Sequence, residues 1–235
     1  METVILCSPL LPEESRAAIE RKSGGKCVSI PMCDTLPTPV NHHPDMLFFN
    51  PPNKGITTLS SGYNAVNPQF FENFATANTE LDTVALQPQY PLDIAFDALA
   101  IGDTLYCLEA HTAESVKKHF PKIVNIRQGY AACSTLVLNE KSAVTADGSI
   151  SKALKQNGVT VLDIAPEGIK LPGYDSGFIG GASAVVGDTV IFFGNLSDHP
   201  NKTEIVSFCK ENGFETLDFP ALPLTDYGSV RKIFQ

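Results

Sequence analysis

Hydrophobic and polar positions follow a unit that recurs along the chain: a short amphipathic helix, a turn, a β-rich run and a proline. The clearest copies are residues 151–166 and 205–220. In both copies Asn-Gly follows the helical part, and glycine readily takes the left-handed conformation that ends a helix. The residues after it alternate between apolar and polar as in a strand, and proline then ends the strand. The pattern predicts repeated helix–turn–strand units.

Three looser copies bring the number of predicted units to five. Their helix-like and strand-like parts are residues 14–22 with 27–31, 68–75 with 83–88, and 113–120 with 123–126. Corresponding strand positions are occupied by Ile30, Leu86, Ile126, Ile164 and Phe219. Hairpin patterns precede four of the five helices, because β-rich runs there are joined by short turns rich in Gly, Asn and Asp. These hairpins are predicted at residues 46–59, 96–108, 133–145 and 183–193.

The two ends of the chain complete this pattern. The first helix has a single strand before it, residues 3–7, and the chain ends in a lone strand-like run, residues 229–234. Pairing of these two runs would close the sheet edges. The prediction is an α/β fold: a five-bladed, pseudo-fivefold α/β propeller of ββαβ units, closed by the N- and C-terminal strands, with residues 1–235 as a single domain. An open α/β sandwich built from the same elements is the alternative.

Composition narrows the class of protein. With 43% hydrophobic and 18% charged residues, the chain does not have the composition of a disordered protein. A net charge of -9 without a basic run argues against nucleic acid, and no apolar run is long enough for a membrane span. The start lacks a cationic secretory n-region, and the six cysteines form no Cys-x-x-Cys pair, so we expect a reduced, cytoplasmic protein. The sequence suggests no metal site and no cofactor.

Two short stretches carry a resemblance to a known family. His43-Pro-Asp45-Met-Leu47 and the Gly-rich approach to Cys133, residues 129–136, resemble motifs of the pentein fold. This is the five-bladed α/β propeller of guanidino-modifying enzymes, among them arginine deiminase, dimethylargininase, agmatine deiminase and amidinotransferases. The family's cysteine normally lies in the closing strand. This chain has Thr-Asp-Tyr-Gly-Ser there, at residues 225–229, and no cysteine after Cys209.

The resemblance implies a chemistry for specific residues. Cys133 would be the nucleophile, His43 the general acid and base, and Asp45 an anchor for the guanidinium. A guanidinium is planar and cationic and pairs best with carboxylates, while its weakly electrophilic carbon needs a thiolate. Asp97 is a second candidate for substrate binding in the central funnel and is favoured over Asp93; Asp175 could also line the funnel. Each of these residues also has a structural alternative, since cysteine at a strand start often packs and aspartate often caps turns.

The hypothesis for function is a hydrolase of a small cationic guanidino or amidino compound, acting through Cys133, His43 and Asp45. We expect these residues and Asp97 to line the largest hollow of the molecule. We also expect Cys133 to be the most reactive of the six cysteines. The sequence leaves open whether His42 or His43 faces the funnel, and what the oligomeric state is. Two alternatives stay open: a non-catalytic pentein-fold module that binds a protein partner, as in the ribosomal-subunit anti-association factor, and a cysteine-dependent hydrolase of another substrate.

Overall fold

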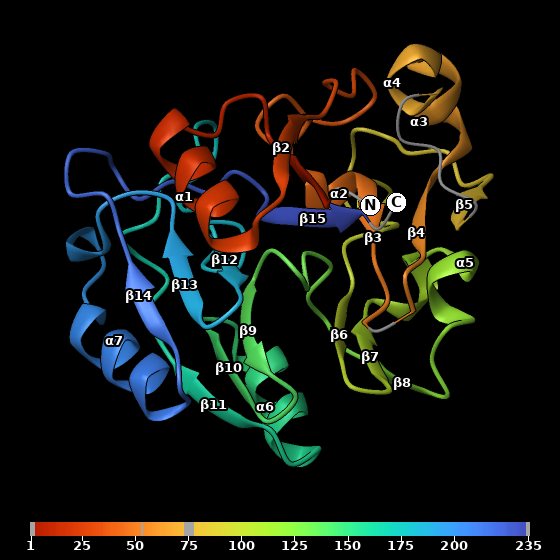
Figure 1. Cartoon of the computed structure of the whole chain (residues 1–235). Helices are drawn as coiled ribbons and strands as arrows, with labels where there is room; N and C mark the ends of the chain where they lie inside the picture. Colours follow the sequence, from red (N-terminus) through yellow and green to blue (C-terminus); the bar gives the residue numbers. More distant parts are fainter. Residues whose placement is uncertain (1–2, 53, 73–77, 234–235) are drawn as a thin grey trace.

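Five small sheets build the molecule. In the part of the chain that the computed structural model describes, residues 3–52, 54–72 and 78–233, the strands form five three-stranded sheets (Figure 1). Each sheet has an antiparallel pair followed by a parallel third strand, with the second strand of the pair in the middle. The sheets comprise β15 (Val230–Ile233), β1 (Val4–Cys7) and β2 (Lys26–Ser29); β3 (Phe48–Phe49), β4 (Thr57–Ser60) and β5 (Thr79–Asp82); β6 (Leu99–Ile101), β7 (Thr104–Cys107) and β8 (Lys122–Asn125); β9 (Thr135–Asn139), β10 (Ser142–Thr145) and β11 (Thr160–Asp163); and β12 (Ser183–Val186), β13 (Thr189–Phe192) and β14 (Glu215–Leu217).

Helical segments make the crossover from the middle strand to the third strand of each sheet. The segments are α1 (Glu13–Ser23); α3 (Ser61–Val66) and α4 (Pro68–Glu72); η1 (Glu109–His111) and α5 (Glu114–Lys117); α6 (Gly148–Gln156); and η2 (Leu196–Asp198) and α7 (Lys202–Glu211). One more helix, α2 (Pro44–Leu47), precedes β3. As predicted, α6 and α7 end directly before Asn-Gly. The middle strands β1, β4, β10 and β13 are buried along their whole length, whereas the third strands β2, β8 and β11 are partly exposed.

Contacts between neighbouring sheets close a ring. Strand β9 contacts both β6 and β12, α5 contacts β5, α2 contacts β15, and α1 contacts β13. The chain ends are joined because β15 pairs antiparallel with β1, from Val4 opposite Ile233 to Cys7 opposite Val230. The predicted α/β propeller of five ββαβ units, closed by its terminal strands, is confirmed. No helix within the described ranges is both long and apolar enough to cross a membrane.

Two predicted strands are wrong in position. Residues 83–88 lie outside any strand, and the strand that pairs with β4 is β5, which ends at Asp82. Leu86 is nevertheless buried, so its apolar character reflects packing in the core rather than sheet pairing. Met46 and Leu47, predicted to begin a strand, instead end α2, where Pro44 occupies a first-turn position that suits proline. The predicted helix over residues 68–75 extends partly beyond the described residues.

The first strands of the five sheets surround the axis of the ring. A cavity of about 210 Å³ is lined by Phe49, Leu99, Leu136, Ala184 and Arg231, one residue from each of β3, β6, β9, β12 and β15. These strands are therefore neighbours around one centre. The segments that lead into them must approach each other, and this is where the candidate residues lie.

Candidate functional site

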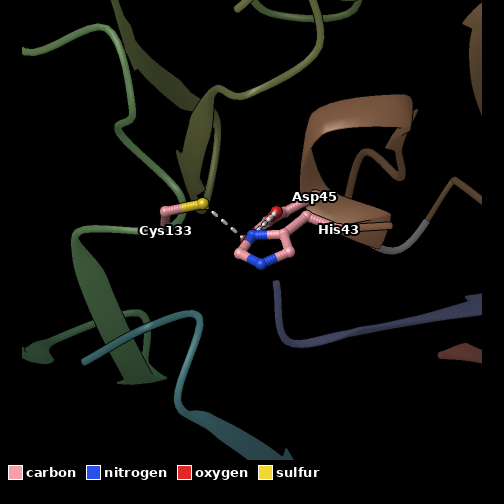
Figure 2. A group of neighbouring side chains, drawn as sticks. All are labelled: His43, Asp45 and Cys133. Atoms are coloured by element: carbon pink, nitrogen blue, oxygen red, sulfur yellow. Dashed lines mark hydrogen bonds and ion pairs between the residues drawn. The ribbon is translucent and has the colours of Figure 1, made fainter. Parts of the chain in front are cut away.

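The candidate residues come from segments that enter the first strands of different sheets. His43 directly precedes α2, and Asp45 lies in α2, which leads into β3. Asp97 lies two residues before β6, and Cys133 lies two residues before β9. Figure 2 shows the side chains of His43, Asp45 and Cys133 pointing toward one another. One nitrogen, one oxygen and the sulfur atom of these three residues lie within 4.8 Å of one another.

A direct hydrogen bond links the thiol to a carboxyl group. Cys133 Sγ donates to Asp45 Oδ2 at 2.8 Å (Figure 2). The other oxygen, Asp45 Oδ1, lies 3.9 Å from His43 Nδ1 and has no hydrogen-bond partner. All three side chains are at most 2% exposed, and neither ring nitrogen of His43 forms a hydrogen bond. The cluster thus holds buried polar atoms that a ligand could satisfy.

Asp97 holds the backbone at Cys133. Its Oδ1 accepts hydrogen bonds from the backbone N–H of Ala132 at 2.6 Å and of Cys133 at 3.3 Å. Its Oδ2 is buried without a partner. Asp97 therefore fixes the chain that carries the thiol, and one of its oxygens stays available.

Asp226 is a fifth member of the cluster, and sequence reasoning missed it. Its Oδ1 lies 3.7 Å from His43 Nδ1, and its two oxygens accept hydrogen bonds from the backbone N–H of Phe178 and Gly228. Glycine is required around it: a Cβ on Gly181 would lie 1.9 Å from Asp226 Oδ1, and one on Gly228, which has φ +74°, would lie 2.4 Å from His43 Cβ. The available signal was the Thr-Asp-Tyr-Gly-Ser run at residues 225–229, where an aspartate stands two residues before a glycine.

Burial sets the protonation states of the carboxyl groups. It raises the pKa of Asp226 to about 7 and raises the pKa of Asp45. Burial, together with the nearby charge of Asp45, raises the pKa of Asp97 well above its usual value. The Arg231 guanidinium, whose Nε donates to the carbonyl of Phe48, partly offsets these shifts by lowering the pKa of Asp45 and Asp97. The cluster retains protons that exposed carboxyl groups would lose.

Burial also sets the protonation states of the His43 imidazole and the Cys133 thiol. It lowers the pKa of His43 despite the nearby Asp45, so that the neutral imidazole is favoured. Burial and then the charges of Asp45 and Asp97 raise the pKa of Cys133 well above its usual value. The resting thiol therefore keeps its proton, which runs against the expectation that Cys133 is the most reactive of the six cysteines in the protein without ligand.

A small cavity gives access to part of the cluster. This inner cavity, of about 70 Å³, is lined by His43, Cys133 and Asp226 together with Tyr130, Tyr174 and Phe178. Asp45 and Asp97 are not among the lining residues. His43 rather than His42 faces it, since His42 pairs through Nδ1 with Ser8 Oγ. A cavity of about 560 Å³ between β5 and η1 is larger, so the prediction that this site is the largest hollow is wrong.

The donor atoms of the cluster suit a metal ion as well as an organic ligand. An imidazole nitrogen, a carboxylate oxygen and a thiolate sulfur are the ligands that Zn²⁺ takes in proteins. Among the described residues, His43, Asp45 and Cys133 could hold such an ion. Spacing along the sequence gave no sign of this, because the ligands come from separate sheets.

The ring of five ββαβ units is the pentein fold. Dimethylarginine dimethylaminohydrolase from Pseudomonas aeruginosa, a cysteine-to-serine mutant complexed with citrulline, has a similar structure. It is 14% identical with a TM-score of 0.55, over 93% of this chain and 92% of that one. Agmatine deiminase from C. jejuni with substrate bound is 13% identical with a TM-score of 0.55, over 99% and 93% of the two chains. At such low sequence identities, these structural matches show that the fold is shared.

Within that fold the chain belongs to a family of unknown function, DUF6873, whose model matches residues 10–231. No curated protein sequence in the comparison matches the chain.

Proposed function

We propose that this protein hydrolyses a small cationic guanidino or amidino compound, with Cys133 as nucleophile and His43 as general acid and base. The observation that carries the proposal is the buried cluster itself: a thiol, an imidazole and three carboxyl groups meet at the centre of a pentein ring. The structural neighbours named above are enzymes that act on guanidino compounds, which supports the same class of substrate.

Electrostatics support a cationic substrate. Asp45, Asp97 and Asp226 all have raised pKa values because each is buried with few compensating charges. A guanidinium that entered the inner cavity would favour their ionised forms, and it would favour the thiolate of Cys133 for the same reason. The free Oδ1 of Asp45 and Oδ2 of Asp97 would accept its N–H groups once it reached them. The substrate would thus activate the nucleophile that attacks it.

The proposed reaction has two halves. In the first half, the thiol proton passes to His43 and the sulfur of Cys133 bonds to the amidino carbon. A carbon–nitrogen bond of the substrate then breaks, and the departing amine takes the proton from His43. In the second, a water molecule gives a proton to His43 while its oxygen bonds to the same carbon. The carbon–sulfur bond breaks, and the sulfur takes the proton back. The products are the amine and a urea or amide. The proton that carried the positive charge of the substrate is released as the carbonyl forms, and the amine takes it up in solution.

Product release and a covalent intermediate test this proposal. We expect ammonia or an alkylamine to appear when the protein is incubated with a panel of alkylguanidines. Mass spectrometry of quenched reactions should find the amidino adduct on the peptide that contains Cys133. Cys133→Ser should abolish both signals, whereas Cys27→Ser, a change at a half-buried cysteine outside the cluster, should keep them. Turnover that survives Cys133→Ser would refute the proposal.

A non-catalytic binding role is the second candidate, and the raised pKa of Cys133 favours it. A thiol that stays protonated even with ligand bound would serve as a hydrogen-bond donor to Asp45 and not as a nucleophile. In that case the parent protein would bind guanidines without turnover, and Cys133→Ser would bind them equally well. Calorimetric titration of both proteins distinguishes the two roles.

A further inference from the structure

A second cavity lies directly outside the inner cavity. This outer cavity, of about 400 Å³, shares Tyr130, Tyr174 and Phe178 with the inner one, so these three side chains form the partition between them. Tyr90 and Asp93 add to the wall of the outer cavity. The inner cavity, at about 70 Å³, is far smaller than the several hundred Å³ typical of ligand pockets. A ligand with its amidino end at Cys133 would therefore extend its other end into the outer cavity.

Aromatic rings dominate the wall of the outer cavity. The ring centroids of Tyr90 and Tyr130 are 5.4 Å apart, and those of Tyr130 and Phe178 are 6.1 Å apart. Tyr90 and Tyr174 are 49% and 44% exposed, so part of this aromatic surface is open to solvent. Aromatic faces attract organic cations through the ring quadrupole, and cages of such rings bind ammonium groups.

Asp93 supplies a carboxyl group at the same place. Its Oδ2 accepts a hydrogen bond from the Tyr130 hydroxyl at 2.7 Å, whereas its Oδ1 is buried without a partner. Burial raises the pKa of Asp93, and the bond from Tyr130 opposes that shift. A buried acceptor without a partner is unfavourable, and an ammonium group bound there would satisfy it.

Positive side chains are missing from both walls. Among the described residues that line either cavity there is no lysine or arginine, and the outer cavity has no histidine either. A carboxylate on the ligand would meet Asp93 or Asp226 without a cation to pair with. The charge pattern therefore selects against an amino acid and in favour of a ligand whose far end is positive or neutral.

From these observations we propose that the outer cavity is a cation subsite, with Asp93, Tyr130 and Tyr174 as specificity-determining residues. The substrate class is then a guanidine or amidine that carries a second positive charge at its far end and no carboxylate. This inference rests on the proposed function for the orientation of the ligand, but the binding it predicts does not require catalysis.

Calorimetry on the Cys133→Ser protein tests the subsite without turnover. The probes are 4-aminobutylguanidine, butylguanidine and arginine, which differ in the distal ammonium and the carboxylate. We expect 4-aminobutylguanidine to bind about tenfold more tightly than butylguanidine, as one charge-assisted hydrogen bond allows. We expect arginine to bind more weakly than both. Adding Asp93→Asn should remove the tenfold preference, and Asp175→Asn, a change at an exposed neighbouring carboxyl group, should keep it.

If the Asp93→Asn protein does not fold, two further variants test the subsite in its place. Tyr174→Ala removes a half-exposed ring, and Tyr130→Phe keeps its ring but loses the hydrogen bond to Asp93. Tyr174→Ala should weaken the binding of 4-aminobutylguanidine several-fold more than the binding of butylguanidine.

The outcomes separate this inference from the proposed function. A preference for 4-aminobutylguanidine that depends on Asp93 supports the subsite even if the parent protein hydrolyses none of the probes, in which case only the proposed function fails. Equal affinity for 4-aminobutylguanidine and butylguanidine, or tighter binding of arginine, overturns the subsite even if the parent hydrolyses them. No binding of 4-aminobutylguanidine overturns it as well.

Discussion

Replacing Asp226 by asparagine tests the electrostatics of the cluster while Cys133 and His43 stay in place. Burial raises the pKa of Asp226 from 3.8 to about 7 in the folded protein. Below about pH 4 the carboxyl group is protonated in the folded and unfolded states alike, and it imposes no penalty. Between about pH 4 and pH 7 the unfolded chain loses this proton while the folded protein keeps it, so stability falls as pH rises. Above about pH 7 both states are ionised and the penalty is constant.

The magnitude follows from the size of the shift. Each pH unit within that window lowers the free energy of unfolding by about 1.4 kcal/mol, which gives roughly 4 kcal/mol over the whole window. Between about pH 5 and pH 8 the expected loss is roughly 3 kcal/mol. Asparagine does not titrate, and its amide cannot accept both backbone bonds that Asp226 accepts from Phe178 and Gly228. That lost bond costs about 1–3 kcal/mol at every pH, so the slope with pH is the quantity to compare.

Urea unfolding at a series of pH values measures this slope. We expect the free energy of unfolding of the parent protein to fall by roughly 3 kcal/mol relative to Asp226→Asn between about pH 5 and pH 8. Asp175→Asn, at an exposed loop position, serves as the charge-matched control. Parallel curves for the parent and Asp226→Asn, within about 1 kcal/mol, would refute the reasoning, because Asp226 would then titrate as an exposed carboxyl group.

Three further outcomes are expected. Chloroacetamidine should alkylate Cys133 at least ~10-fold faster than neutral chloroacetamide, because the cation favours the thiolate; equal rates, with the other cysteines as internal controls, would contradict substrate-assisted ionisation. Gly181→Ala should lower the melting temperature strongly, since its Cβ would lie 1.9 Å from Asp226 Oδ1, whereas Gly148→Ala, with open space around it, should change it little. Deleting residues 229–235 should unpair β1 and reduce solubility or stability, and an unchanged melting curve would contradict this.

The architecture could be predicted from the sequence because each unit repeats local signals that do not depend on the rest of the fold. Asn-Gly at residues 157–158 and 212–213 ends two helices, and Gly-Asp turns at 102–103 and 187–188 lie within two hairpins. The strand predicted at residues 83–88 failed because Leu86 is apolar for another reason. It packs in the core after the sheet has ended, and periodicity alone does not distinguish the two cases.

Only part of the candidate site could be predicted from the sequence. His43, Asp45 and Cys133 could be named because they stand beside short motifs, and the structure brings them together. Asp226 also stands in a short run, Thr-Asp-Tyr-Gly-Ser, but its place in the cluster depends on Gly181, 45 residues earlier in the sequence. The raised pKa of the Cys133 thiol could not be predicted from the sequence either. The motifs around His43 and Cys133 do not show how many carboxyl groups are buried with them.

The buried carboxyl groups place a physical constraint on whatever occupies the centre of the ring. Three aspartates lie near one neutral histidine and one offsetting arginine, and their raised pKa values measure the free energy of keeping carboxylates there without a counter-charge. An anionic ligand would increase that cost and a neutral one would leave it unchanged. Only a cation reduces it, and a planar cation with several N–H donors also satisfies the free oxygens of Asp45 and Asp97. The same ligand would lower the pKa of Cys133, so binding and activation of the thiol follow from one electrostatic cause.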